Sequence, residues 1–356
     1  MPQRSFCLAL MLALLLPSTI SLADPVAFIG SWELTPVDGG AGWLEVRQDD
    51  GIYAGTLLWM GGSPEPMNRV YFDGDTLHGF RIVDDEIRDS ADVLVKTQQH
   101  PIFLTATLEG SRLRGMITQP SRDGANVVKA EFNGVRSDPM PAVPDLAQVE
   151  LGDPIQLFNG RNLDGWIVAG GAHWGKLKDS SNADGWIPVD SDVANGWSVI
   201  DGVLTNNPAQ TEGQPYIRYG NLITKTNFED FNLTLEVKAP QDGNSGIYLR
   251  GIYEIQIRDS HGKPLDSHNM GALYGRIAPS RDVEKGAGEW QAVDITLVDR
   301  HLTVKLNGQI IIDNAPVTGC TGGALWSDES RPGPIYFQGD HTSIQYRNIV
   351  LRPVEN

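Results

Sequence analysis

The sequence predicts an all-β protein in which a small antiparallel β-barrel or sandwich precedes a two-sheet jelly-roll sandwich. Three observations carry this prediction. Gly (39) and Pro (22) are abundant in a chain of 356 residues, which favours short strands and turns over long helices. Apolar and polar residues alternate in many short segments bounded by turn signals. No stretch keeps a helical period, so crossover helices and a parallel sheet are not expected.

The first unit is predicted over residues 24–137. Turn signals such as Asp50-Gly51, Asp73-Gly74 and Glu109-Gly110 separate its strands. Alternation predicts strands at Trp43–Arg47, Tyr53–Trp59, Ile102–Leu108, Leu113–Ile117 and Val127–Phe132. Gly30-Ser31-Trp32-Glu33-Leu34 loosely resembles the beginning of lipocalin-like barrels.

A proline-rich linker over residues 138–150 and a second β unit over residues 151–356 complete the predicted organisation. Pro139, Pro141 and Pro144 favour a stiff, extended linker. Asn307-Gly308 predicts a tight hairpin. Strands are expected at Asn232–Lys238, Gly246–Arg250, Ile252–Arg258, Val293–Val298, Leu302–Leu306, Gln309–Asp313, Ile335–Gln338 and Ser343–Leu351.

Residues 1–23 have the pattern of a secretory signal peptide. Arg4 supplies the positive charge, Leu8–Leu16 is an apolar run too short to span a bilayer, and Ser21-Leu22-Ala23 supplies small residues for cleavage. We therefore expect a secreted or periplasmic protein without membrane insertion after cleavage. Cys320 would be the remaining cysteine, and its Gly-rich surroundings favour a small buried side chain over a catalytic thiol.

The net charge of the chain restricts the kinds of molecule that it is expected to bind. Lys and Arg number 28 against 45 Asp and Glu, giving a formal net charge of −17. A nucleic-acid partner is excluded because the phosphate backbone requires a basic footprint. Docking on anionic lipid is disfavoured for the same reason. A small neutral molecule remains compatible.

A polar sheet face is the first candidate for chemistry. Side chains alternate along a strand, and the predicted strands around residues 232–258 follow one another in the chain. They are expected to bring together Glu236, Tyr248, Arg250, Glu254, Gln256 and Arg258. Acids, arginines, an amide and an aromatic residue together are typical of a sugar site. A solvated face with paired charges is the alternative.

The loop that follows holds Asp259, His261, Asp266 and His268. These residue types ligate metals, but their spacing matches no zinc or calcium pattern. A loop rich in hydrogen bonds, forming a rim, is the favoured interpretation. No cofactor is predicted, and a divalent metal stays open.

Many motifs of the second unit, in the right order, resemble the 3-keto-disaccharide hydrolase family, whose members are also described as 3-keto-glucoside 1,2-lyases or 3-keto-2-hydroxyglucal hydratases. The resemblance covers residues 155–353. It rests on Leu157–Trp166, Trp197–Gly202, Leu222–Lys225, Phe231–Leu233, Asn244–Arg250, Tyr253–Gln256, Gly271–Gly275, Gly288–Trp290, Leu306–Gly308, Gly333–Gln338, His341 and Tyr346–Ile349. Two departures are Gln291, where Asn is usual, and the insertion Ala172–Asn195.

The resemblance implies a concanavalin-like jelly roll that acts on glycosides oxidised to a ketone at C3. It implies catalytic roles for Glu254, His341, Lys225 and Arg250, and substrate binding by Glu236, Gln256, Tyr274, Gln338 and His268. Glu254 or His341 is the expected base, and Lys225 or Arg250 the expected enolate stabiliser. A Lys225–Glu236 ion pair that only orders the face is the alternative for those two residues.

The implied reaction begins with removal of the C2 proton and ends with elimination of the C1 aglycone, with or without hydration. It needs a base, a proton donor and a group that polarises the ketone. The competing function is a non-catalytic carbohydrate-binding jelly roll, in which Trp174, Trp186 and Trp326 would be stacking platforms.

Overall fold

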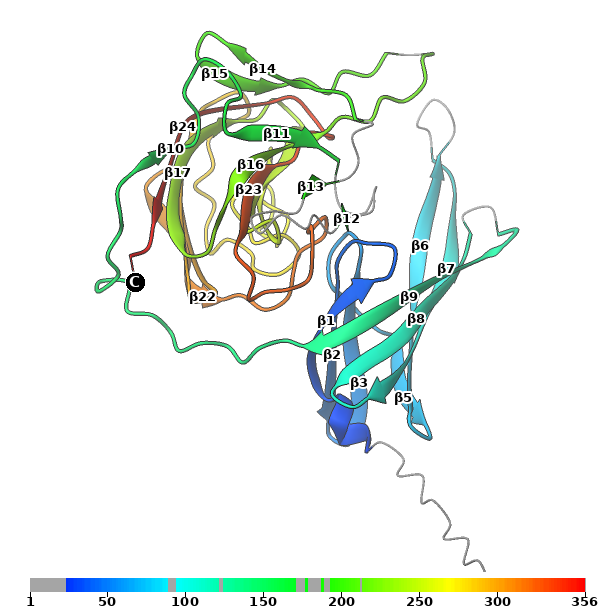
Figure 1. Cartoon of the computed structure of the whole chain (residues 1–356). Helices are drawn as coiled ribbons and strands as arrows, with labels where there is room; N and C mark the ends of the chain where they lie inside the picture. Colours follow the sequence, from blue (N-terminus) through cyan, green and yellow to red (C-terminus); the bar gives the residue numbers. More distant parts are fainter. Residues whose placement is uncertain are drawn as a thin grey trace, which may run out of the picture.

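The computed structural model describes residues 24–88, 94–121, 124–170, 177–178, 187–188, 193–211 and 213–355. The predicted signal peptide and the inserted Trp174 and Trp186 lie outside the described residues. Apart from a 3₁₀ helix, η1 (Pro25–Phe28), the regular structure of this part of the chain is β-strand, which confirms the predicted all-β class (Figure 1). None of its helices is long and apolar enough to cross a membrane.

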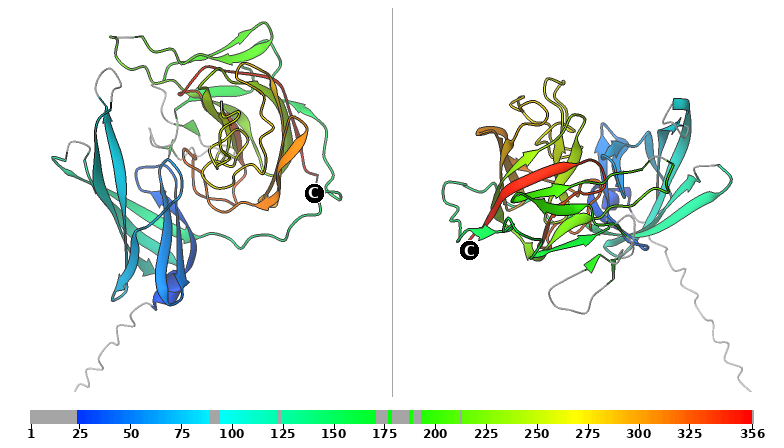
Figure 2. Two further views of the ribbon diagram at one scale, coloured as in Figure 1. Left: turned by 180° about the vertical axis from the view of Figure 1, so that it is seen from behind. Right: turned by 90° about the horizontal axis from the view of Figure 1, so that it is seen from above.

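The first unit is one antiparallel sheet of nine strands in the order β4-β3-β2-β1-β9-β8-β7-β6-β5, curled into a barrel-like body (Figures 1 and 2). Its strands are β1 (Gly30–Pro36), β2 (Gly42–Asp49), β3 (Ile52–Trp59), β4 (Glu65–Pro66), β5 (Arg69–Asp73), β6 (Thr76–Arg88), β7 (Leu94–Glu109), β8 (Arg112–Pro120) and β9 (Val127–Arg136). Alternation along β1 and β2 buries Trp32, Leu34, Leu44 and Val46 on the inner side.

The second unit is a sandwich of two antiparallel sheets, as expected of a jelly roll. The larger sheet has the order β14-β15-β24-β17-β20-β21-β22, with β10 also paired to β24. It comprises β10 (Ile155–Gln156), β14 (Trp197–Ile200), β15 (Val203–Asn206), β17 (Phe231–Lys238), β20 (Gln291–Val298), β21 (His301–Leu306), β22 (Gln309–Pro316) and β24 (Ile344–Pro353). Asn307 (φ 51°) and Gly308 (φ 80°) form the predicted tight turn between β21 and β22.

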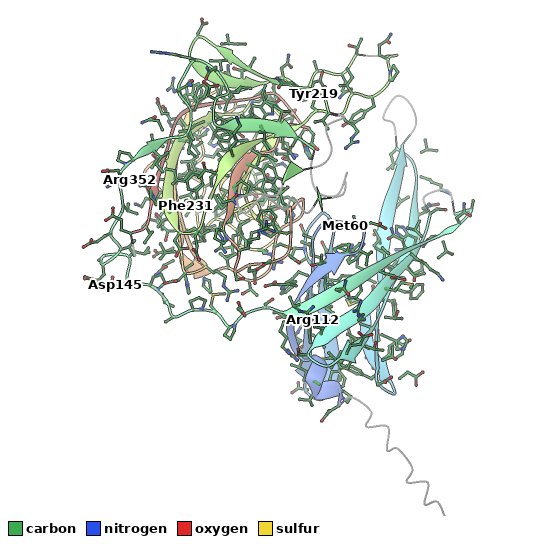
Figure 3. The ribbon with its side chains drawn as sticks, in the orientation of Figure 1. Met60, Arg112, Asp145, Tyr219, Phe231 and Arg352 are labelled. Carbon is green, nitrogen blue, oxygen red and sulfur yellow. The ribbon has the colours of Figure 1, made fainter. Side chains whose placement is uncertain are left out.

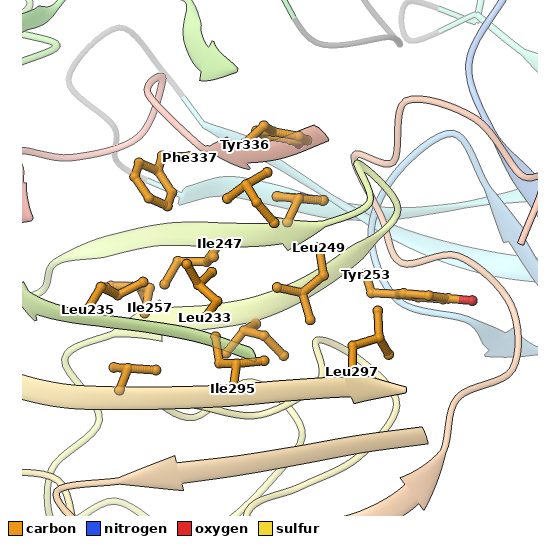
Figure 4. Packing of buried hydrophobic residues seen from close by; sticks show 14 of the residues in the cluster. Leu233, Leu235, Ile247, Leu249, Tyr253, Ile257, Ile295, Leu297, Tyr336 and Phe337 are labelled. Atoms are coloured by element: carbon orange, nitrogen blue, oxygen red, sulfur yellow. The ribbon is translucent and has the colours of Figure 1, made fainter. Parts of the chain in front are cut away.

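The smaller sheet has the order β11-β16-β23-β18-β19. It comprises β11 (Trp166–Ala169), β16 (Asn221–Phe228), β18 (Asn244–Leu249), β19 (Tyr253–Arg258) and β23 (Gly333–Phe337), and a separate pair is formed by β12 (Leu177–Lys178) and β13 (Ile187–Pro188). The core lies between the two sheets. Figure 4 shows Leu233, Leu235, Ile295 and Leu297 of the larger sheet near Ile247, Leu249 and Ile257 of the smaller one.

The barrel packs directly against the jelly roll. Trp43 of β2 is 5% exposed and belongs to the hydrophobic cluster of the second unit, together with Ala41 and Leu58. The Arg276 guanidinium lies 4.5 Å from the centre of a Trp43 ring. Gly319 has a φ of 75°, and a methyl group there would lie 2.6 Å from Trp43. The tryptophan ring therefore packs against backbone that carries no side chain.

The linker is fastened to the jelly roll along its length. Arg300 donates hydrogen bonds to the carbonyl oxygens of Asp138 (2.8 Å) and Pro139 (2.7 Å). Asn314 donates to the carbonyl oxygen of Pro144 at 3.0 Å. Figure 3 shows Asp145 on this extended segment. The linker therefore holds the two units together as well as spacing them.

Two buried carboxyl groups meet where the units join. Glu33 of β1 is 6% exposed, and the backbone N–H of Glu329 donates to its Oε1 at 3.4 Å. Glu329 is 1% exposed and forms an ion pair with Arg300 at 3.0 Å. Burial, followed by the negative charge of Glu329, raises the pKa of Glu33 from 4.5 to about 8. Glu33 is therefore protonated at neutral pH.

We expect Glu33→Gln to reduce the loss of thermal stability between pH 6 and pH 9. The folded-state pKa of Glu33 exceeds its unfolded value, so its contribution to stability falls as pH rises from 4.5 towards about 8. Glutamine keeps the shape of the neutral acid and removes this loss. The midpoint of thermal unfolding, measured across that range, should fall less in the variant than in the wild type. An equal fall of the midpoint with pH in both proteins would show that ionisation of Glu33 does not cause the loss of stability.

Candidate active site

The outer face of the smaller sheet carries a group of buried polar side chains. Tyr248 of β18 pairs with Glu254 of β19, and Gly246 pairs with Gln256. Alternation sends these side chains away from the core, which their strand neighbours fill. Yet Tyr248, Glu254 and Gln256 are only 1%, 4% and 2% exposed. Loops cover this face, so it is a buried site and not a solvated surface.

A cavity of about 200 Å³ lies over this face. It is lined by Gly61, Gly62, Asn244, Tyr248, Glu254, Gln256, Tyr274, Gly322, Gly323, Gln338 and His341. The glycines from the barrel and from the loop after β22 bring bare backbone to the cavity. Its side chains are predominantly hydrogen-bonding groups, which suits a polyhydroxylated ligand.

Glu254 is held as a neutral acid. Burial is the main cause that raises its pKa from 4.5 to about 8. The hydrogen bond with Tyr248, followed by the positive charge of His341, opposes this increase. The Tyr248 hydroxyl lies 2.7 Å from both Glu254 Oε2 and the Gly322 carbonyl oxygen. A phenol has a single hydrogen, and the carbonyl can only accept it. Both contacts are satisfied when Glu254 carries a proton and donates it to the phenol oxygen.

Packing leaves this carboxyl group little room to move. The Tyr248 ring stacks on Tyr336 with centroids 3.9 Å apart, and Tyr336 donates to the Gly323 carbonyl oxygen. On the other side of the carboxyl group, a methyl group on Gly246 would collide with Glu254 Oε1. Gly246 is therefore required for close packing, because its own φ is not positive.

His341 is the second proton carrier of the cavity. Its Nδ1 lies 2.6 Å from Asp340 Oδ1, and its side chain is 41% exposed. The hydrogen bond to Asp340 raises the pKa of His341 and burial opposes this. Because an ionised carboxylate can only accept, Nδ1 carries the hydrogen of the neutral ring. Nε2 is then left with the lone pair that a general base needs.

Gln256 and Tyr274 add groups that can bind a hydroxyl or a ketone. The Oε1 atom of Gln256 is buried and has no hydrogen-bond partner within the described protein. An acceptor in that state is suited to a ligand hydroxyl, since burying it unpaired costs free energy. Burial is the main cause that raises the pKa of Tyr274, so its hydroxyl stays a neutral donor.

Several residues from the sequence analysis lie elsewhere. Glu236 was expected on the same face but belongs to β17 of the larger sheet, where Arg347 binds both its carboxylate oxygens at 2.9 Å. Lys225 is exposed on β16, and no Lys225–Glu236 pair forms. Arg250 donates instead to the carbonyl oxygens of Glu329 and Arg331.

His268 lies next to the cavity and does not line it. Its ring is edge-on to Tyr274, with centroids 5.0 Å apart, and its Nε2 contacts Ser63 Oγ at 2.7 Å. The predicted pocket residues Glu254, Gln256, Tyr274, Gln338 and His341 do line it together. Arg258 is exposed at the end of β19.

Sequence reasoning placed Tyr248 on the candidate polar face without a role of its own, and it did not assign Asn244 or Asp340 to the site. Tyr248 had an available signal, because alternation places it on the same face as Glu254. Asp340 had another, because it directly precedes His341. The barrel residues Gly61 and Gly62 carried no sequence signal, since they lie far from the other lining residues in the chain.

The other side chains that the sequence analysis considered for a functional role are buried in the protein. Cys320 is fully buried, and burial raises the pKa of its thiol to about 12, which fits the predicted small core side chain. Trp326 is 6% exposed, with Arg331 over its ring, so it offers no open stacking platform. Among the described residues, no group of three or more His, Cys, Asp or Glu side chains is arranged to hold a metal. The family departure Gln291 is buried away from the cavity and bonded to Asn307.

The match to a protein family indicates a carbohydrate-active protein. A family described as the 3-keto-alpha-glucoside-1,2-lyase-like domain matches residues 153–352. Among solved structures, a candidate glycosyl hydrolase from Parabacteroides distasonis is 18% identical, covering 57% of this chain and 94% of its own, with a TM-score of 0.42. A second from the same organism is 27% identical, covering 61% and 94%, with a TM-score of 0.41. No curated protein matches.

We expect Gly246→Ala to destabilise the jelly roll by about 1–3 kcal/mol, because the added methyl group displaces a buried carboxyl group. Equilibrium urea unfolding measures this change. Gly286→Ala is the matched control, since its nearest atom would lie at 3.5 Å and its φ is not positive. It should change the free energy of unfolding by less than about 0.5 kcal/mol. Equal effects in the two variants would contradict the close packing around Glu254.

Proposed function

Because this chain belongs to the 3-keto-alpha-glucoside-1,2-lyase-like family, we propose that it cleaves 3-keto-glycosides by elimination. The observation that carries the proposal is the pairing of two different proton carriers in one cavity. Glu254 holds a proton up to about pH 8, and His341 presents an imidazole oriented by Asp340. An elimination uses a general acid and a general base, and both groups must be within reach of the substrate.

The ketone at C3 makes the C2 hydrogen acidic. His341 Nε2 takes that proton, and the C2–H electron pair becomes the carbon–carbon double bond of an enolate whose charge rests on the C3 oxygen. The enolate then re-forms the ketone as the C1–oxygen bond breaks. The departing oxygen takes the bonding pair and a proton from Glu254. The products are an unsaturated keto-sugar and the free aglycone alcohol.

Hydration can follow on the same groups. Water adds at C1 of the unsaturated product and gives its proton to the Glu254 carboxylate, while protonated His341 returns its proton to C2. The net result is hydrolysis, and both groups regain their starting protonation states. The sugar's own ketone serves as the electron sink throughout, so the proposed scheme calls for no cofactor. Tyr274 and Asn244 line the cavity and can donate hydrogen bonds, so on this proposal they supply the polarisation of the ketone first assigned to Lys225 or Arg250.

We also propose that the reaction takes place outside the cytoplasm, in the periplasm or the medium. The support is the signal-peptide pattern of residues 1–23. The substrate on this proposal is a small oxidised glycoside, and the acidic surface disfavours an anionic one.

We expect the wild type to release the aglycone from an aryl 3-keto-glucoside and not from the plain aryl glucoside. Glu254→Gln should lower kcat at least a hundredfold through loss of the general acid. Its thermal midpoint should stay within a few degrees, because glutamine replaces an acid that is already neutral. Chromogenic aglycone release and thermal unfolding supply the two measurements.

Glu236→Gln is the matched control for this experiment. It makes the same chemical change on the other sheet, where Glu236 pairs with Arg347, and should leave kcat unchanged. Wild-type turnover in Glu254→Gln removes that residue from the mechanism. A wild type that binds the keto-glucoside without releasing the aglycone supports a binding protein instead.

The pH dependence of kcat/KM offers a separate check. The acid must be protonated, so we expect kcat/KM to fall above about pH 8, the pKa of Glu254. The base must be neutral, so kcat/KM should also fall on the acid side as His341 gains its proton. Initial rates corrected for spontaneous elimination at each pH give the profile. Activity that stays level to pH 10 argues against Glu254 as the acid.

A further inference from the structure

One wall of the cavity comes from the barrel. The loop Met60–Pro64 joins β3 to β4, and its residues Gly61 and Gly62 line the cavity beside Glu254 and Tyr248. Figure 3 shows Met60 where the barrel meets the jelly roll. The wall therefore belongs to a unit outside residues 153–352, the part of the chain that matches the family.

The jelly roll has two glycines shaped to receive this loop. A methyl group on Gly322 would collide with the backbone of Gly62. A methyl group on Gly275 would lie 2.7 Å from Ser63 Oγ. Any larger residue at either position would push the loop away. The fit shows that the loop touches the jelly roll at two glycines, of which Gly322 lines the cavity.

A hydrogen-bonded side chain fixes the loop to the cavity rim. Ser63 Oγ lies 2.7 Å from His268 Nε2, and the His268 ring is edge-on to Tyr274. His268 is itself held by its backbone N–H, which donates to Asp266 Oδ1 at 2.7 Å. Tyr274, which the His268 ring contacts, lines the cavity. The position of the loop is thus coupled to the position of a cavity side chain.

The other end of the loop is anchored by the buried interface. The backbone N–H of Met60 donates to the Ala41 carbonyl oxygen at 2.9 Å. Ala41 and its neighbour Trp43 are buried in the cluster of the jelly roll. The loop therefore begins at a hydrogen bond within the barrel, beside residues that pack into the jelly roll, and Ser63 contacts the jelly roll near the other end of the loop.

We propose that the barrel completes the active site, and that its loop Met60–Pro64 limits the substrate to a terminal keto-sugar with a small aglycone. The cavity of about 200 Å³ is smaller than the roughly 300–1,000 Å³ that drug-sized ligands occupy. One sugar ring suits such a volume, whereas an internal unit of a polysaccharide needs openings at both ends. This inference rests on the proposed function for its substrate. Ser63 and His268 are positioning residues that hold the wall.

Gly61→Leu is the direct test. The Cβ of residue 61 would meet no atom within 4 Å, and its φ is not positive, so the fold accepts a larger residue at this lining position. We expect kcat/KM for an aryl 3-keto-glucoside to fall at least tenfold, and less for the methyl 3-keto-glucoside. The thermal midpoint should stay near that of the wild type. Asp75→Leu, in the exposed turn between β5 and β6, adds the same side chain away from the cavity and should leave kcat/KM unchanged.

Ser63→Ala tests whether the contact between Ser63 and His268 holds the loop Met60–Pro64 in place. We expect a several-fold rise in KM with kcat nearly unchanged, and recovery of KM in Ser63→Thr, which keeps the hydroxyl. A purely structural role would lower the thermal midpoint and leave KM alone. Unchanged KM in Ser63→Ala together with unchanged kcat/KM in Gly61→Leu overturns the proposal.

Calorimetric titration with an aryl C-glycoside of 3-keto-glucose, whose aryl group is bound through carbon and cannot leave, separates this proposal from the proposed function. If the wild type binds the keto-sugar but does not release aglycone, the catalytic function fails, and weaker binding to Gly61→Leu still supports the wall. If Gly61→Leu binds this ligand as tightly as the wild type does, the proposed role of the loop Met60–Pro64 is wrong, whatever the turnover. A wild type that neither binds nor turns over a keto-sugar overturns both.

Discussion

The burial of both faces of the β18–β19 hairpin is the constraint on which the site depends. One face packs Ile247, Ile255 and Ile257 into the sandwich core. The other face also lies under protein and presents Glu254 to a small cavity. A carboxyl group so placed loses hydration, which costs the charged form far more than the neutral one. The neutral acid, the Tyr248 contacts and the bare backbone at Gly246 and Gly322 all follow from that burial.

The same constraint operates where the two units join. Glu33 is buried against Glu329, and its pKa is raised to about 8, as is that of Glu254. The two groups differ in what surrounds them. Glu33 has packed protein around it, whereas Glu254 borders a cavity that a ligand can enter. The raised pKa of Glu33 therefore reflects the packing of the two units against each other. The raised pKa of Glu254 marks a candidate catalytic group.

Local patterns in the sequence predicted the fold class, most strands of the jelly roll and the Asn307-Gly308 turn. They also placed Tyr248, Glu254 and Gln256 on one face, because strict alternation holds along a hairpin. The same argument does not carry to Glu236, since the chain crosses to the other sheet between β17 and β18. It does not carry to Arg250 either, whose φ of 54° ends the strand and redirects the side chain.

Long-range contacts account for what the sequence did not predict. Ser63 and His268 are separated by 205 residues, and Gly62 meets Gly322 across an even longer stretch of chain. Glycines at such contacts look like ordinary turn residues in the sequence. Only the packed structure shows that their missing side chains make room for a loop of another unit.

The proposed elimination fits the side chains around the cavity better than the usual hydrolysis of glycosides does. Hydrolysis through an oxocarbenium-like state uses two carboxyl groups on opposite sides of the scissile bond. Among the described residues that line this cavity, Glu254 is the single carboxyl group, and it is neutral below about pH 8. An imidazole takes the place of the second carboxylate, and an imidazole suits proton abstraction from carbon at neutral pH. On the proposed function, a ketone on the substrate would supply the acidity that makes this pair of proton carriers sufficient for the reaction.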